Sequence, residues 1–295
     1  MKKQFCIRKN TENSILEERQ SINPVETMAA VLGVLKTECI NIGLEKKQQK
    51  NKKRNTMSEN RRIMKRTFKI EREYYEEGQK LYKKKHVTFE SGVTVLVGCN
   101  GCGKTTLINH LKYEIEKNLK LPCVYYDNLK QGGKSSMHDA FYYEDYAFAS
   151  TIFSASEGEG IVLNMQRIAA KIGNMFKQHP NSEEYWILLD AIDGGLSIDA
   201  IVDIKEGLFK TIFDTYPNKK IYIIVSANGY EMARGEKCFN TVNCEYINIK
   251  SYERYRNIIL KSREYKDKRD LIFASNQPRE NQEVNQEVRW MKTRN

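Results

Sequence analysis

The spacing of apolar residues along the chain changes several times, and each change predicts an element. Four short apolar runs are typical of buried strands: 93–97, 122–126, 184–190 and 220–227. Residues 105–117 and 160–178 instead place apolar side chains at helical spacing. Because strands and helices alternate, the pattern predicts an α/β fold with a mostly parallel central sheet.

Two segments ahead of the first buried strand alternate between apolar and polar residues. They span 67–75 and 80–89, and Gly78 between them offers a turn. A period of two predicts strands with one buried face. We therefore expect a small antiparallel entry sheet that leads into the strand at 93–97.

A glycine-rich segment follows the strand at 93–97. Residues 98–105 fit G-x-x-x-x-G-K-[ST] at every fixed position, with a strand before and a helix after, the context that this motif needs. Its glycines let backbone N–H groups wrap a phosphate at the positive end of the helix dipole. The segment predicts a nucleotide-binding loop rather than a plain glycine turn. The residues expected to hold the nucleotide phosphates are Gly98, Asn100, Gly101, Gly103, Lys104, Thr105 and Thr106.

The apolar strand at 184–190 ends in a carboxylate. In phosphate-loop proteins such a carboxylate holds Mg²⁺ together with the hydroxyl that follows the loop lysine. We therefore expect Thr105 and Asp190 to bind Mg²⁺, and Lys104 to reach the β- and γ-phosphates of ATP.

Two segments together resemble ABC-type ATPases, in particular the branch that includes structural-maintenance-of-chromosomes and related DNA-repair proteins. Residues 100–106 are similar to N-G-x-G-K-[ST]-[ST], and residues 190–197 are similar to D-E-x-D-x-x-L-D. The resemblance covers roughly residues 67–250. It implies a P-loop NTPase domain with a minimal helical subdomain, since only about 25 residues separate Gln131 from Ser156.

The resemblance also implies roles for residues further along the chain. Gln131 resembles the Q-loop glutamine, which in the family touches the metal and the attacking water. Ser156-Glu157-Gly158-Glu159 resembles the signature motif S-G-G-Q/E, whose serine and glycine bind the γ-phosphate of ATP held by the other subunit. ATP would thus draw two copies into a head-to-tail homodimer, in which Ser156 and Gly158 act across the interface. An aromatic residue often stacks on adenine, for which Tyr74, Tyr75 and Tyr82 are candidates.

Two departures from the family pattern concern hydrolysis. The family's general base falls at Ala191, and its switch histidine falls at Ala227. Loss of a general base typically costs roughly 10²–10⁴-fold in rate. Asp193 could stand in for the base or be a solvated loop carboxylate, and Asn228 could orient water. We therefore expect catalysis to rest on Lys104, Asp190 and Gln131 and to be slow.

The net charge of +11 is unevenly placed. Residues 1–66 contain 16 Lys and Arg against 7 Asp and Glu, a net of +9, which leaves +2 for the remainder. A basic arm suggests nucleic acid or an acidic protein partner, or it is a solvated extension. We divide the chain into a flexible basic extension at 1–66, an ATP-binding domain at 67–261 and a charged tail at 262–295.

The composition also bears on location. No apolar run approaches the roughly 18 residues that span a bilayer, and the N-terminus does not look like a secretory signal. We therefore expect a cytoplasmic protein whose seven cysteines are reduced. Cys99 and Cys102 form a C-x-x-C, but without a second pair we expect no zinc there.

Three functions remain open at the level of sequence. The first is an ATPase that drives or gates a partner by closing on ATP. The second is an ATP-held switch or clamp that barely hydrolyses, and the third is a DNA-associated ATPase that uses the basic arm. A small-molecule kinase fits less well, because residues 156–159 and 190–197 would then need separate explanations.

Overall fold

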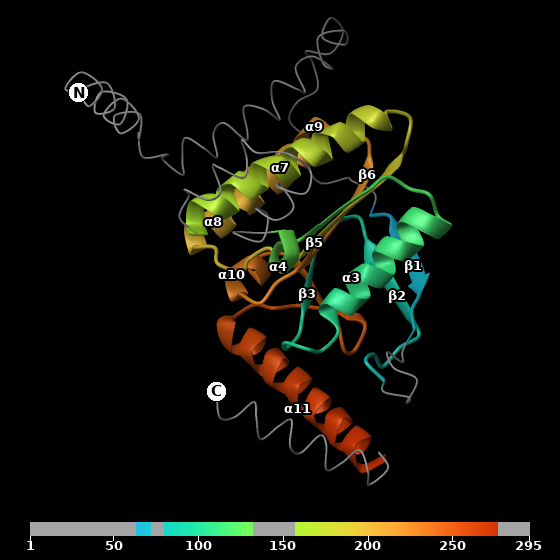
Figure 1. Ribbon diagram of the computed structural model, residues 1–295, viewed down its shortest axis with the longest axis vertical. Coiled ribbons are helices and arrows are strands. Elements are labelled where there is room, and N and C mark those ends of the chain that lie inside the picture. The colour runs from blue at the N-terminus through green and yellow to red at the C-terminus, as the bar shows by residue number, and fades with distance from the viewer. Residues whose placement is uncertain (1–62, 72–79, 132–156, 277–295) are drawn as a thin grey trace, which may run out of the picture.

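The computed structural model describes residues 63–71, 80–131 and 157–276. Tyr74, Tyr75 and Ser156, together with most of the basic extension, lie outside these segments. The two ends of the chain in Figure 1 lie outside them as well.

A six-stranded sheet forms the centre of the molecule, in the order β4-β5-β6-β3-β7-β8 (Figure 1). The strands are β4 (Cys123–Asp127), β5 (Glu184–Asp190), β6 (Lys220–Ser226), β3 (Gly92–Val97), β7 (Lys237–Asn240) and β8 (Glu245–Ile247). The first five run parallel, and β8 pairs with β7 in the antiparallel sense. Strands β5 and β6 are continuously apolar because layers cover both of their faces. The predicted α/β fold with a mostly parallel sheet is confirmed.

A separate two-stranded antiparallel sheet precedes β3, as expected. It pairs β1 (Lys65–Lys69) with β2 (His86–Glu90), so β2 is shorter than the alternation at 80–89 predicts. The carbonyl of Lys85 still accepts the N–H of Ile70 at 2.9 Å, whereas the N–H of Lys83 donates to the carbonyl of Val242 at 2.9 Å. A two-pronged contact from Arg66 to Glu184, at 3.0 and 2.8 Å, joins β1 to the start of β5.

Two buried cores lie on opposite faces of the central sheet. One face packs against β1, β2, α3 (Lys104–Tyr113) and its π-helical continuation η2 (Glu114–Asn118). The other face packs against a second set of helices, with which Tyr255 is also buried. These helices are α7 (Glu157–Gln178), α8 (Ile198–Asp203), η3 (Ile204–Phe209), α9 (Lys210–Thr215) and α10 (Tyr230–Ala233). Because the first five strands run parallel, their carboxyl ends all lie at one edge of the sheet.

Helix α4 (Asn128–Gln131) follows β4 at this edge, and the long helix α11 (Tyr252–Asn276) lies just beyond it (Figure 1). Helix α11 runs without a break through residue 262, where the sequence pattern suggests that a charged tail begins. The division of the chain into domains stays a prediction. None of the helices in the described segments is long and apolar enough to span a membrane.

Candidate nucleotide site

The glycine-rich loop connects β3 to α3, as its sequence predicts. Gly101 and Gly103 have φ angles of 76° and 103°, a region that side chains with a Cβ rarely adopt. The hydroxyl of Tyr82 donates to the carbonyl of Gly103 at 2.7 Å, and a Cβ at Gly103 would lie 3.0 Å from that hydroxyl. Tyr82 therefore packs against Gly103 and holds the backbone of the loop, a role that the sequence does not reveal.

The side chain of Lys104 is almost fully buried beneath this loop. Its Nζ donates to the carbonyls of Gly98 and Cys99 at 2.7 and 3.2 Å. These bonds hold the ammonium within the loop, at the N-terminus of α3. A cation and a helix N-terminus at one point favour the binding of an anion there.

Asp190 ends β5 beside the loop, and the residue is only 1% exposed. Ser226, at the end of the neighbouring strand β6, donates its hydroxyl to Oδ1 of Asp190 and accepts the N–H of Ala191 at 3.0 Å. The other carboxylate oxygen, Oδ2, has no hydrogen-bond partner among the described residues. A buried carboxylate oxygen without a partner is costly, and a cation would satisfy it.

A cavity of about 510 Å³ lies over the loop and these strand ends, within the range of small-molecule sites. Asp190 is the one carboxylate among its lining residues. The residues that surround it are Leu81, Asn100, Gly101, Gly103, Lys104, Thr105, Thr106, Leu129, Asp190, Ala191, Ser226, Asn228 and Arg269. Of the predicted phosphate-binding residues of the loop, only Gly98 lies outside this lining, and it lines a neighbouring cavity.

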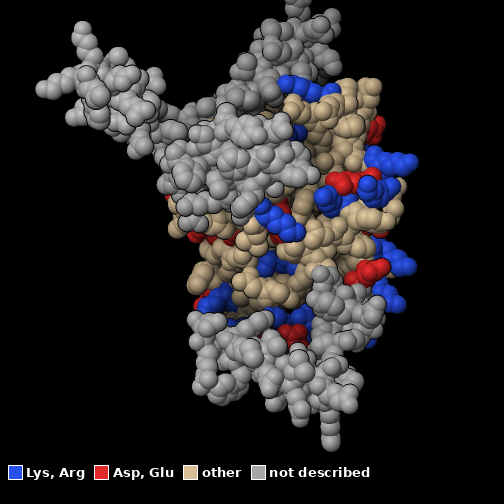
Figure 2. Space-filling model, in the orientation of Figure 1, with Lys and Arg blue, Asp and Glu red and all other residues tan. Residues whose placement is uncertain are grey.

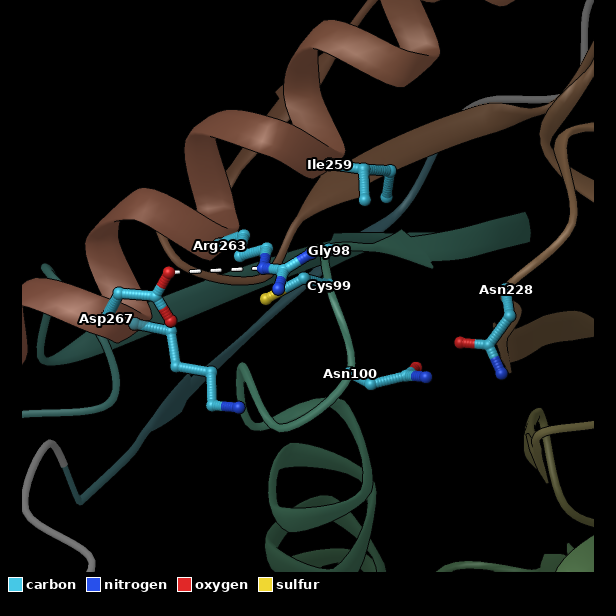
Figure 3. Close-up of a pocket in the computed structure, with 8 residues that line it drawn as sticks. Gly98, Cys99, Asn100, Asn228, Ile259, Arg263 and Asp267 are labelled. Atoms are coloured by element: carbon cyan, nitrogen blue, oxygen red, sulfur yellow. Dashed lines mark ion pairs between the residues drawn. The ribbon is translucent and has the colours of Figure 1, made fainter. Parts of the chain in front are cut away.

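The neighbouring cavity, about 410 Å³ in volume, lies between the loop and α11 (Figure 3). Asn100 and Asn228 line both cavities, and Figure 3 shows their side chains facing the same space. Arg263 and Asp267 approach the loop from α11. Together the two cavities wrap around the phosphate loop.

Two polar residues of β4 and α4 were missed at the sequence level. Asp127 is paired in register with Asp190, is 3% exposed, and accepts the N–H of Leu129 at 3.1 Å. The amide of Asn128 donates to the carbonyls of Ala191 and Gly194 at 3.1 and 3.0 Å. Asp127 ends an apolar strand and Asn128 follows it directly, so the signal that identified Asp190 could have found them.

The backbone at Ala191 is unusual. Its φ of 51° lies in the left-handed region, which costs a residue with a Cβ about 1–2 kcal/mol. Its carbonyl also accepts the N–H of Gly194 at 3.0 Å, which closes the turn after β5. The position that is a catalytic glutamate in the resembling family therefore carries neither a carboxylate nor a relaxed backbone here.

The interpretation of Asp193 as a solvated loop carboxylate is wrong. Asp193 is only 8% exposed, and its Oδ2 accepts the N–H groups of Asn228, at 2.8 Å, and of Gly229. Burial raises the pKa of Asp193, and the bonds from these two N–H groups oppose the rise. The carboxylate lies inward because it accepts two N–H groups of the segment after β6. It ties the loop after β5 to that segment.

The remaining predicted site residues lie less centrally. Gln131 ends α4 outside the cavity lining, and its Oε1 has no hydrogen-bond partner among the described residues. Gly158 is in the first turn of α7, whose N-terminus faces the same edge of the sheet as the loop (Figure 1). Of the three tyrosines considered for adenine stacking, the structure describes Tyr82, which is buried against Gly103.

The C-x-x-C of the loop is a buried thiol pair. A hydrogen bond with Cys102 lowers the pKa of Cys99 to about 6, against the opposing effect of burial. The hydroxyl of Ser262 and the cations Lys104 and Lys266 add to the lowering, while the same thiol contact and burial raise the pKa of Cys102. No group of three or more His, Cys, Asp or Glu suited to a metal occurs within the described segments.

Comparison with known proteins supports the assignment of the loop. A family model described as an AAA domain matches residues 77–115, which contain the loop and α3. Among solved structures the chain matches the ADP conformation of MJ1267, an ATP-binding cassette of an ABC transporter, at 16% identity and a TM-score of 0.38. That match covers 66% of this chain and 94% of the cassette. No curated protein matches the chain.

Proposed function

We propose that the protein binds Mg-ATP in the 510 Å³ cavity and hydrolyses it slowly, in a head-to-tail dimer that drives or gates a partner. The observation that carries the proposal is the unpartnered Oδ2 of Asp190, buried beside Lys104 and Thr105. A carboxylate, a hydroxyl and a lysine at the N-terminus of a helix suit Mg²⁺ and phosphate.

In this proposal the chain's own residues position the nucleotide. The loop N–H groups and Lys104 bind phosphate oxygens, and Thr105 and Asp190 would hold Mg²⁺, which would neutralise developing charge on the phosphates. Ser226 fixes the orientation of the Asp190 carboxylate through its hydroxyl. Slow hydrolysis follows because no second carboxylate lines the cavity among the described residues.

The first test is ATP binding and steady-state hydrolysis by wild type, Lys104→Ala and Ala191→Glu. We expect wild type to bind Mg-ATP with little turnover, Lys104→Ala to lose binding, and Ala191→Glu to hydrolyse faster. Ala191→Gly is the matched control, because it relaxes the backbone without adding a base. If wild type does not bind ATP, the proposal is wrong; if Ala191→Gly accelerates hydrolysis as much as Ala191→Glu, the missing base is not the cause.

The second test concerns the dimer. Sedimentation of the wild type with Mg-ATP should show a dimer, and Mg-ADP should leave a monomer. In ABC-type ATPases the signature motif contacts the γ-phosphate of the ATP that the other subunit holds, and ADP lacks this phosphate. Ser156→Arg should keep ATP binding and abolish dimer formation. A wild type that stays monomeric with Mg-ATP would contradict this part of the proposal.

The positive charge of the basic extension, residues 1–66, favours a second candidate function, a DNA-associated ATPase. Its net charge of +9 over residues 1–66 would bind phosphates with a steep dependence on salt. Deletion of residues 1–56 tests it: a strong loss of DNA affinity supports it, and unchanged affinity excludes the arm as the DNA contact.

A further inference from the structure

Helix α11 approaches the phosphate loop with one continuous face. Residues at spacings of three and four lie on one side of a helix, and here they are Tyr255, Ile259, Ser262, Lys266 and Arg269. The first three are buried or half-buried, and the last two are cations. The face is therefore apolar where it packs on the body and positive where it passes the loop.

Three polar contacts fix the helix against the body. The hydroxyl of Ser262 accepts the N–H of Cys99 at 2.8 Å, within the phosphate loop itself. Tyr255 donates to the carbonyl of Asn228 at 2.7 Å, and Tyr265 donates to the carbonyl of Lys80 at 3.1 Å. Because these contacts reach three separate segments, the register of α11 over the loop is well defined.

Two cations of this face lie beside the phosphate loop, Lys266 in the lining of the neighbouring cavity and Arg269 in the lining of the 510 Å³ cavity. Lys266 packs on the loop so closely that a Cβ at Gly101 would lie 3.1 Å from its Cε, and no described carboxylate lies within ion-pair distance of its ammonium. Arg269 lines the same cavity as Lys104, Thr105 and Asp190. Its side chain is 12% exposed, and Asp270 holds the guanidinium at 2.9 Å.

The charge of the helix is also high for its place in the chain. Helix α11 contains seven Lys and Arg and four Asp and Glu, a net of +3, although residues 67–295 together carry only +2. Figure 2 shows both basic and acidic side chains on the lower part of the described surface. Basic side chains therefore outnumber acidic ones on this helix.

We propose that Arg269 binds the phosphate chain of the nucleotide from within the same subunit, with Lys266 beside it on the loop. The inference rests on the proposed function, since it assumes that the cavity takes a nucleotide. An arginine offers a planar fork of donors that suits phosphate oxygens, and a largely buried arginine binds them with little competition from water. The site would then obtain in cis a cation that a phosphate-loop protein can otherwise receive from a partner.

The test is the affinity of the full-length protein for ATP, ADP and adenosine, measured for wild type and variants. Arg269→Ala should weaken ATP and ADP about 10- to 100-fold, the usual value of a charged hydrogen bond to phosphate, and should leave adenosine unchanged. Arg269→Lys should recover part of the loss. Arg256→Ala is the matched control, because Arg256 is on the same helix, 55% exposed, and outside both cavities.

A second measurement separates binding from folding. The rate at which iodoacetamide alkylates Cys99, followed by peptide mass spectrometry, reports whether α11 stays docked on the loop. Arg269→Ala should keep the wild-type rate. If Arg269→Ala binds ATP as wild type does while Lys104→Ala does not bind, the inference fails and the proposed function stands. It also fails if Arg269→Ala alters the Cys99 rate as much as Ser262→Ala does. If wild type itself binds no ATP, the proposed function is what fails.

Discussion

At the scale of residues, the site depends on a few buried polar groups that have no substitute partners. Ser226 is the clearest case. Its hydroxyl serves the carboxylate of Asp190 and the N–H of Ala191 at once, and the residue is 2% exposed. No other side chain in the described segments bonds to Asp190, so the position of the proposed metal ligand depends on this hydroxyl.

We predict that Ser226→Ala lowers the free energy of unfolding by about 2–3 kcal/mol, because two buried groups lose their partner. It should also raise the Mg²⁺ concentration needed for ATP binding. Urea unfolding and a Mg²⁺ titration check the two effects. Thr67→Ala is the control: its hydroxyl contact with Thr88 is exposed and should be worth less than about 1 kcal/mol. Equal losses in the two variants would contradict the prediction.

The thiols of the loop give a prediction about pH. The pKa of Cys99 is lowered to about 6, first through the hydrogen bond with Cys102. The nucleophilic thiolate therefore forms as the pH rises through about 6, and alkylation of Cys99 should level off above pH 7. Cys102→Ala should move the midpoint up toward the ordinary range of a thiol, near 8.5. A wild-type rate that keeps rising to pH 9 would refute the lowered pKa.

At the scale of elements, α11 is the part of the molecule that ties the end of the described chain to the nucleotide site. It contributes Tyr255 to the main core, a hydroxyl to the loop and a cation to the cavity. When the contact between this helix and the loop is lost, we expect the loop to become more mobile.

We predict that Ser262→Ala costs about 1–2 kcal/mol of unfolding free energy, since the N–H of Cys99 is left buried without an acceptor. Hydrogen exchange at Cys99 should become faster, while exchange in β5 and β6 should change only as far as global stability does. Lys261→Ala, an exposed neighbour on the same helix, should change neither. Unaltered exchange at Cys99 in Ser262→Ala would show that the contact does not hold the loop.

At the scale of the whole molecule, both cores and both cavities are built from residues 63–276. The polar, Lys-rich run at 46–54 is typical of a linker, and a compact domain could begin at Met57. We therefore expect the body to fold and bind nucleotide without the first 56 residues.

We predict that a chain starting at Met57 keeps the thermal midpoint of the full-length protein within about 2 °C, equivalent to about 1 kcal/mol or less. Its affinity for ATP should also be unchanged. Thermal unfolding and calorimetric titration of the two proteins check this. A large fall in the thermal midpoint of the shortened chain would show that residues 1–56 pack on the body.

The sequence by itself determined the fold class and the identity of the phosphate loop. Continuous apolar runs such as 184–190 and 220–227 can only be buried on both faces, and the motif at 98–105 carries its chemistry in its own local geometry. Only the tertiary structure decided the surroundings of that loop. Asp193 turned inward because distant N–H groups needed an acceptor, and Arg269 reached the cavity because α11 folds back across the loop. These contacts join residues far apart in the chain, and no local periodicity encodes them.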